Sequence, residues 1–255
     1  MTYVVTTSSF KSQLMEQIKN KPFALLPDSI DCELLKKWLT TARHEVHQLE
    51  IDRLNDIVGV VTGMQGTGAP GITYKNVARI QDINDAYSSI VNMDYFPITV
   101  NQLPIVQGTR LTAEEFLTHI RKNINDFVHT NLAKFTPYEW PSYNEAALWN
   151  SSNPLGAVIE IDIAEYMGVS DDGSVIVSGY SPDKWTFTTI YDPKYGSHPV
   201  SGHRDFGYVE NPNGSYTFYT RGVDRLTGFW GTQLQSLTGV PFEKRTLCGS
   251  LFRFL

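Results

Sequence analysis

Cysteine, long apolar runs and positive charge are all scarce in this sequence. Cys32 and Cys248 are too few for a disulfide scaffold and lack the spacing of a zinc site. No apolar run reaches the roughly 20 residues of a membrane helix, and residues 1–20 lack the basic start and apolar centre of a signal peptide. Lys and Arg number 21 against 27 Asp and Glu, a formal net charge of −6. General nucleic-acid binding is therefore not expected, because it needs a basic surface.

The apolar content is nevertheless sufficient for a folded core. Hydrophobic residues make up 41% of the chain and charged residues 19%, which indicates a globular protein. Six of the 19 glycines precede residue 156, and the other 13 lie in residues 156–255. We expect a helix-rich part over residues 1–150 and an antiparallel β part over 151–255, joined in one compact unit. The predicted fold class is α+β, with N-terminal helices packed on a C-terminal antiparallel β-sheet.

Apolar residues at steps of three and four predict helices in the first part. One helix is expected over residues 29–57, a second over 76–91 and a shorter one over 10–18. The clearest spans 113–134, because Thr112 and Glu115 form the sequence pattern of a capping box. Its apolar stripe consists of Phe116, Leu117, Ile120, Ile124, Phe127 and Val128.

After Pro154 the apolar residues recur at every second position, which predicts strands. Ile159, Ile161 and Ile163 alternate with acidic residues, as in a strand with one wet face. Asn213-Gly214 stands between two alternating aromatic runs and predicts a β-hairpin. The further strands are expected over 174–179, 184–191, 206–210, 215–221 and 247–255.

Several short motifs resemble parts of known sites without matching them. The segment Gly63–Gly71 lacks the spacing of a dinucleotide loop and the lysine of a P-loop, so we interpret it as a mobile loop. His44-Glu45-Val46-His47 is one residue short of a zincin helix, and solvated side chains on a helix explain it without a metal. Gly179–Asp183 misses the nucleophile-elbow pattern, and Cys248 is interpreted as a buried structural thiol. No motif predicts a cofactor.

The densest polar cluster lies between residues 198 and 225. Imidazoles can move protons near neutral pH, and a guanidinium fork can bind a carboxylate or phosphate in two places. The alternative interpretation is structural, with the charges pairing to clamp turns. As an active site, the cluster would use His198 or His203 as general acid or base, Asp205 or Asp224 to orient a histidine, Ser201 as a weak nucleophile, and Arg204, Arg221, Arg225 and Tyr219 to bind substrate.

The same cluster carries a resemblance to a known family. His198-Pro199-Val200-Ser201-Gly202, then Arg204, Phe206-Gly207 and the segment Gly214–Arg225, is similar to part of the C-terminal modules of bacterial polymorphic toxins of the Rhs type and related secreted effectors. The resemblance covers about 30 residues and assigns no catalytic role. It implies action on a target cell, a cognate immunity protein, and secretion or delivery without a classical signal peptide; without such delivery the protein would be cytoplasmic.

Two functional hypotheses follow. The first is a toxin-type hydrolase that acts on an anionic or acyl-containing substrate of the target cell. The second is a non-catalytic module whose aromatic strands dock a protein or a glycan. His198 or His203 in a concave pocket with two arginines would favour the enzyme, whereas the same groups in ion pairs beneath a flat surface would favour the module.

Overall fold

The computed structural model describes residues 2–5, 32–56, 58–61, 74–88, 91–106, 108–128, 130, 133–140, 143–163 and 172–228. The helix expected over 10–18, the strand expected over 247–255, the Gly63–Gly71 loop and Cys248 lie outside these ranges.

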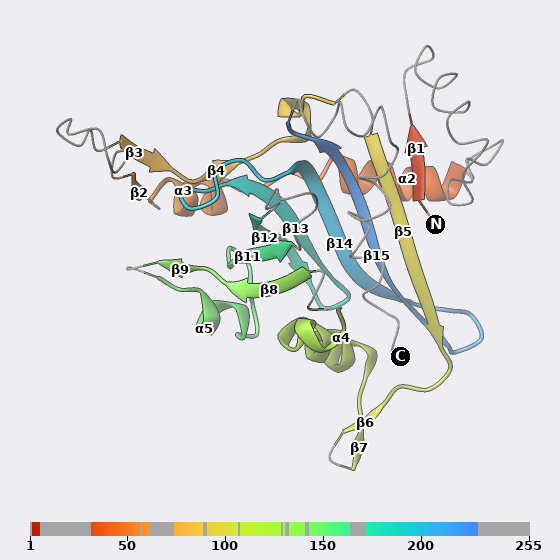
Figure 1. Ribbon diagram of the computed structural model, residues 1–255. Coiled ribbons are helices and arrows are strands. Elements are labelled where there is room, and N and C mark those ends of the chain that lie inside the picture. Colours follow the sequence, from red (N-terminus) through yellow and green to blue (C-terminus); the bar gives the residue numbers. More distant parts are fainter. Residues whose placement is uncertain are drawn as a thin grey trace.

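A single curved antiparallel sheet of nine strands dominates the described structure (Figure 1). The strand order is β1-β5-β15-β14-β13-β12-β11-β8. The short β4 pairs with β13 and is the ninth strand, outside this order. Residues 1–150 contribute β1, β4, β5 and β8, so both parts of the sequence build one sheet. The strands are β1 (Thr2–Val5), β4 (Arg79–Ile80), β5 (Val91–Val100), β8 (Ala133–Pro137), β11 (Val158–Ile163), β12 (Gly173–Ser181), β13 (Lys184–Tyr191), β14 (Val200–Glu210) and β15 (Tyr216–Leu226).

Helices cover both faces of this sheet. Phe218 and Arg221 are three residues apart on β15, so their side chains point to opposite faces. Phe116 of helix α4 packs on Phe218, with ring centroids 5.0 Å apart, and Thr41 of helix α2 accepts a hydrogen bond from Arg221. We call the two sides the α4 face and the α2 face. The helices are α2 (Cys32–Ala42), α3 (Gln48–Asn55), α4 (Ala113–Lys122) and α5 (Glu145–Trp149).

The remaining elements are short. Two 3₁₀ turns, η1 (Ile83–Asp85) and η2 (Ile124–Asp126), interrupt the connections between longer elements. Among the described residues, no helix has the length and apolar character needed to cross a membrane. Among the described residues, three small two-stranded antiparallel sheets are formed by β2 (Val58–Val61) with β3 (Tyr74–Val77), β6 (Ile105–Val106) with β7 (Thr109–Arg110), and β9 (Glu139–Trp140) with β10 (Tyr143–Asn144).

The α+β fold class is confirmed, and so is the start of the clearest predicted helix. The Thr112 hydroxyl accepts from the Glu115 backbone amide at 3.2 Å, and the Glu115 carboxylate accepts from the Thr112 amide at 2.8 Å. Phe116, Leu117, Ile120 and Ile124 are buried in the larger core, and Phe127 and Val128 are half-buried against it. The apolar stripe therefore identified the covered side of α4.

The single helix expected over 29–57 is wrong, because the chain breaks into α2 and α3. The His44 ring hydrogen-bonds the Ser178 hydroxyl at 3.0 Å, which ties the segment between the two helices to the sheet. His47 is extended and stands at the N-cap position of α3, where its side chain makes no capping hydrogen bond. Leu39 in α2 and Leu49 in α3 are exposed.

The helix expected over 76–91 is also wrong, and the helix expected over 113–134 is too long. Ile80 pairs with Ile190 of β13, and the Asp82 side chain accepts from the Asn84 amide, so this segment forms strand and 3₁₀ turn. Helix α4 ends at Lys122. Beyond it, the Asn125 side chain bonds both the backbone amide and the carbonyl of Phe135, which fixes the start of β8.

The strand predictions are largely confirmed. Strand β13 has the expected bounds 184–191, and Asn213-Gly214 lies in the turn between β14 and β15, with Gly214 at φ +78°. Glycine adopts this left-handed conformation without the steric cost other residues meet. Strands β14 and β15 are longer than expected and reach Val200 and Leu226. Almost the whole polar cluster therefore lies on two paired strands.

Candidate functional site

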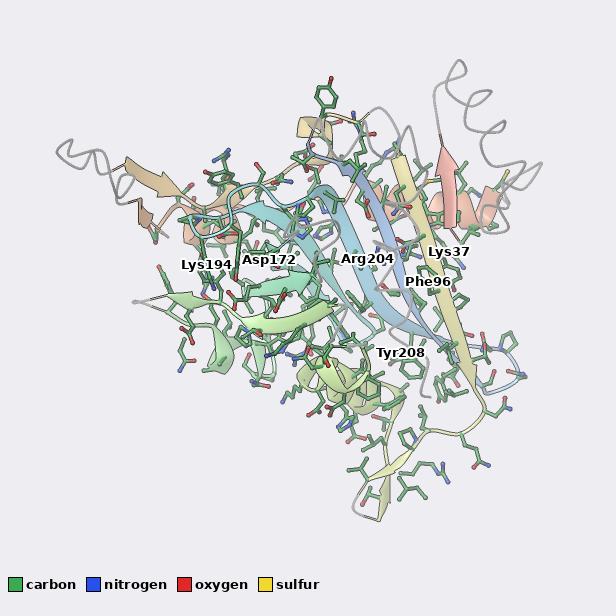
Figure 2. The ribbon with its side chains drawn as sticks, viewed as in Figure 1. Lys37, Phe96, Asp172, Lys194, Arg204 and Tyr208 are labelled. Carbon is green, nitrogen blue, oxygen red and sulfur yellow. The ribbon has the colours of Figure 1, made fainter. Side chains whose placement is uncertain are left out.

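Strand alternation divides the predicted polar cluster between the two faces of the sheet. Strands β14 and β15 pair continuously from Val200 opposite Leu226 to Glu210 opposite Tyr216. Successive side chains on a strand point to opposite faces. Arg204 and Tyr208, four residues apart, point to the same side (Figure 2), whereas the side chain of Asp205 points to the other. The predicted site is thus two separate groups.

On the α2 face, Asp205 is the centre of a closed polar network. Its carboxylate accepts from the hydroxyls of Thr41 and Thr186, each at 2.7 Å, and from Arg221 at 2.8 Å. The Lys184 ammonium lies 3.6 Å away. Burial would raise the pKa of Asp205, but the Lys184 charge, the two hydroxyls and Arg221 outweigh it and lower the pKa. Asp205 and Arg221 form a buried, bonded ion pair.

His203 belongs to the same face through its side-chain contacts. Its Nδ1 lies 2.8 Å from the Thr188 hydroxyl, which in turn lies 2.6 Å from that of Ser178. The ring of His44 packs edge-on at 5.5 Å between centroids. Burial, followed by the neighbouring His44, lowers the pKa of His203 to about 4. The imidazole is therefore neutral at pH 7, and a neutral ring cannot serve as a general acid there.

Three other predicted site residues are engaged in the packing of the fold. The Ser201 hydroxyl accepts from Gln81 at 3.0 Å and is fully buried. Arg225 donates to three backbone carbonyls within segment 83–88 and fixes that turn. Tyr219 is buried beneath the Arg221 guanidinium, 5.1 Å from the ring centroid, and burial raises its pKa to about 12. These contacts anchor the chain.

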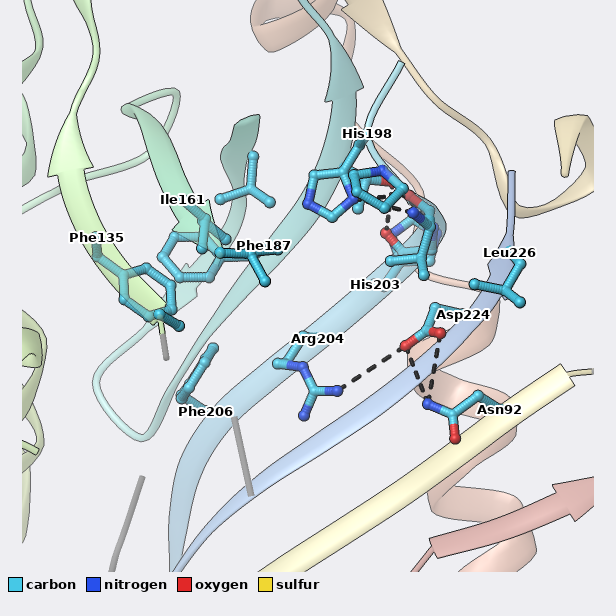
Figure 3. A pocket seen from close by; sticks show the side chains of 17 residues that line it. Asn92, Phe135, Ile161, Phe187, His198, His203, Arg204, Phe206, Asp224 and Leu226 are labelled. Atoms are coloured by element: carbon cyan, nitrogen blue, oxygen red, sulfur yellow. Dashed lines mark hydrogen bonds and ion pairs between the residues drawn. The ribbon is translucent and has the colours of Figure 1, made fainter. Parts of the chain in front are cut away.

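A pocket of about 110 Å³ opens on the sheet (Figure 3). One wall is apolar and contains Phe135, Ile161, Phe187 and Phe206. The opposite wall is polar and brings together three side chains of the predicted site, those of His198, Arg204 and Asp224, together with Asn92, which the sequence analysis did not select. His203 also lines the pocket, but its ring is bonded on the α2 face.

His198 is held in the pocket wall by its neighbours. Gln81 accepts from its backbone amide at 2.9 Å, and its Nδ1 lies 3.0 Å from the Val200 carbonyl. A Cβ atom at Gly173 would lie 2.4 Å from the His198 ring, so the glycine provides the space that the ring occupies. Backbone and side-chain contacts therefore fix this imidazole at the edge of the pocket.

Arg204 is bound in two places by a carboxylate from a distant strand. Its two terminal nitrogens donate to the two oxygens of Asp94 in β5, at 2.7 and 2.5 Å. Asp94 is fully buried, and Asp224 lies 3.9 Å from the same guanidinium. The guanidinium crosses β15 at Gly222, where a Cβ atom would lie 2.3 Å from it. A side chain at position 222 would collide with the ion pair.

Asn92 and Asp94 are the site residues that the sequence analysis missed. Asn92 Nδ2 donates to Asp94 at 3.2 Å and to both Asp224 oxygens at 3.3 and 3.4 Å. Its Oδ1 is buried and accepts no hydrogen bond among the residues that the structure describes. Residues 92 and 94 are two apart on β5, so period-two spacing within Val91–Val100 was the available signal.

The histidine motif at residues 44–47 does not form a metal site. His44 is half-buried against Ser178 between the two helices, and His47 is exposed at the start of α3, so the expectation that both lie on one helix is wrong. Within the described part of the chain, no group of three His, Cys, Asp or Glu side chains is arranged to hold a metal ion.

Comparisons with known proteins leave the family open. No protein-family model matches the chain, and no curated protein matches it. Solved structures of similar fold include the di-domain ARO/CYC StfQ from the steffimycin biosynthetic pathway, at 11% identity and a TM-score of 0.39, covering 66% of this chain and 48% of that protein. The KanY protein (ms6282) has 9% identity and a TM-score of 0.40, covering 63% of this chain and 91% of that one. The lipid transfer and protein localization domain of human StarD13 has 9% identity and a TM-score of 0.38, and the match covers 88% of this chain and 96% of that domain. Similarities this weak assign neither a family nor a function.

Proposed function

We propose that the chain binds a small amphipathic molecule in the pocket of Figure 3. The observation that carries the proposal is the division of this pocket into an apolar wall and a polar wall. Small-molecule sites typically combine an apolar lining with a few polar groups that orient the ligand. A cavity of about 150 Å³ engineered into another protein holds benzene. A pocket of about 110 Å³ therefore suits a single small ring or a short branched chain.

The apolar wall is preorganised by contacts between its rings. Phe206 stacks on Trp185 with centroids 4.8 Å apart and meets Phe187 edge-on at 5.5 Å. Phe187 in turn stacks against Phe135 at 6.3 Å. Because these rings are already fixed, a ligand loses little free energy to ordering them. Each Å² of apolar surface that the ligand buries contributes roughly 25 cal/mol.

A matched pair of substitutions tests the pocket. Ala133 is buried and lines it, so Ala133→Leu should fill part of the space and weaken binding of 2-phenylethanol by about tenfold or more, a cost of about 1.4 kcal/mol. Ala147 is exposed on α5, so Ala147→Leu should leave the affinity unchanged. Binding is measured by chemical-shift titration. A probe that does not bind, or that binds Ala133→Leu as tightly as the original protein, would refute the proposal.

Hydrolysis is a second candidate, favoured by the presence of His198 and Asp224 in the same pocket. Ser201 does not line the pocket, so the chemistry would use water with His198 as the base. Hydrolysis of a small aryl ester, lost in His198→Gln while 2-phenylethanol still binds, would support it. No hydrolysis above the buffer rate would leave only binding.

The toxin-type role and the immunity protein stay predictions from the resemblance. Expression of the chain in the bacterial cytoplasm and, separately, in the periplasm tests this role, because toxicity in one compartment alone would identify where the target lies. The docking module requires exposed aromatic strands, yet Trp185, Phe187, Phe206 and Phe218 are all buried. Among the described residues, these rings support the proposed pocket better than a docking surface.

A further inference from the structure

Two imidazoles on the α2 face are joined by a short chain of hydroxyl groups. His44 Nε2 lies 3.0 Å from the Ser178 hydroxyl. The Ser178 hydroxyl lies 2.6 Å from that of Thr188, which lies 2.8 Å from His203 Nδ1. Ser178 and Thr188 are fully buried and His203 is nearly so. The two hydroxyls are thus shielded from water, and their hydrogen bonds are made within the protein.

The number of hydrogens in this chain allows one ring to donate while the other accepts. Each hydroxyl has one hydrogen to donate, and a neutral imidazole donates from one nitrogen and accepts at the other. The three contacts therefore use two hydroxyl hydrogens and one ring hydrogen. If both rings were protonated, both would donate, and one hydroxyl hydrogen would have to leave the chain. An alternative acceptor for it, the Thr186 carbonyl, lies 3.4 Å from Ser178 Oγ, a long hydrogen bond.

Two positive charges would also repel each other across this contact. The ring centroids of His44 and His203 are 5.5 Å apart. Burial is the largest influence on both rings and lowers the pKa of each, that of His203 to about 4. Asp205 favours protonation of both, but its carboxylate is already bonded to Arg221. The remaining charged groups that act on the two rings are His47 of the same segment, Asp82 before η1 and Lys184 of β13.

The segment that carries His44, residues 43–47, forms a corner between two separately anchored helices. Trp38 anchors α2 in the cluster with Met93 and Val223, and Leu54 anchors α3 in a second apolar cluster. Both anchors are fully buried. Within the corner, Arg43, Glu45 and His47 are exposed and Val46 is half-buried. The corner can therefore separate from the sheet at His44 while both helices keep their apolar anchors.

We infer that protonation of this histidine pair opens the corner between α2 and α3 in acid. In the open form water can solvate both imidazolium rings, whereas the closed form loses a hydrogen bond when the second ring is protonated. A form that binds more protons gains population as the pH falls. The device acts on the α2 face and needs no ligand, so it stands or falls independently of the proposed function.

Amide hydrogen exchange at pH 7.5 and pH 5, divided by the intrinsic rate at each pH, tests the inference. The His44 amide donates to the Thr41 carbonyl and the Glu50 amide to the His47 carbonyl, so both report on the corner. With a pKa of about 4 in the closed form and an ordinary 6.5 in the open form, His203 alone should lower their protection about 25-fold between the two pH values.

Urea distinguishes this local opening from unfolding of the whole chain. Opening of a corner exposes little surface, so 1 M urea should leave the exchange of these amides almost unchanged, whereas amides that exchange through global unfolding should accelerate. Constant protection of the corner from pH 7.5 to pH 5 would overturn the inference. So would an acceleration by urea as large as that of the amides in α4.

A pair of histidine variants assigns the effect to the buried rings. His203→Gln should bring the ratio of protection at the two pH values close to one, because the side chain no longer titrates. His47→Gln, at the exposed histidine of the same corner, should keep the ratio of the original protein. A full ratio in His203→Gln would contradict the inference. If this variant does not fold, the ring resonances of the original protein decide: both rings titrating near pH 6.5 while the corner stays protected would overturn it.

Discussion

Arg204 and Asp205 are neighbours in the sequence, yet they belong to two different environments. On the α2 face, Asp205 receives three short hydrogen bonds and an ammonium, and the cluster is sealed by helix α2. On the pocket side, Arg204 is paired with Asp94 beside open space. A polar group with all its bonds made within the protein stabilises the fold, whereas one beside a cavity can still act on a ligand. Changes on the α2 face should therefore alter stability, and changes in the pocket should alter binding.

The largest expected effect is the loss of the Asp205 charge. Asp205→Asn leaves Arg221 buried beside a neutral group, and breaking a buried pair costs about 3–5 kcal/mol of unfolding free energy. Urea unfolding followed by tryptophan fluorescence measures the loss. Glu210→Gln, exposed at the end of the same strand, should change stability by less than about 0.5 kcal/mol. Equal stability of the two variants would contradict the conclusion that the charges on the α2 face stabilise the fold.

The second effect is a loss of stability in acid through His203. Its pKa is about 4 in the folded protein against an ordinary 6.5, so between these values the unfolded chain binds a proton that the folded chain does not. Unfolding free energy should therefore fall by about 3 kcal/mol as the pH decreases from above 6.5 to below 4.

Urea midpoints at pH 7.5 and 4.5 measure this dependence. His203→Gln should lose most of it, because no imidazole remains at that position to take up the proton. His47 is exposed, so His47→Gln should keep the dependence of the original protein. The same pH dependence in all three proteins would contradict the role of His203.

The smallest expected effect on stability comes from the pocket wall. Ile161→Val removes one methyl group and should cost about 0.5–1.5 kcal/mol, and it should enlarge the pocket by the same volume. Ligands with one additional methyl group on the ring should gain affinity relative to the unsubstituted ring. Ile105→Val, at an exposed site, should change neither stability nor this preference. An unchanged preference in Ile161→Val would place the ligand elsewhere.

Local patterns predicted the local parts of the fold. The capping box at Thr112 located the start of α4, and the turn residues Asn213-Gly214 located a hairpin, because both depend on contacts within a few residues. The helix over 76–91 failed for the opposite reason. Its apolar spacing suits a helix, but Ile80 pairs with Ile190, more than a hundred residues away, and that pairing overrides local propensity.

The candidate site also depends on contacts between residues far apart in the sequence, which local patterns do not predict. The sequence identified His198, Arg204 and Asp224, because the polar residues are dense in that segment. It could not separate Arg204 from Asp205, since their partners lie far away in the chain. Asp94 is 110 residues from Arg204, and Thr41 is 164 residues from Asp205. Only the assembled sheet determines which charges are paired.

The absence of a side chain at Gly222 has a consequence for how the ligand preference could change during evolution. An alanine there would place its methyl group 2.3 Å from the Arg204 guanidinium, so the fork would have to leave Asp94. A guanidinium displaced toward the pocket would bring its positive charge closer to the proposed ligand and would leave the buried Asp94 without this partner. A single substitution at this position would therefore change the polar character of the pocket, at a cost in stability that compensating changes near Asp94 would have to recover.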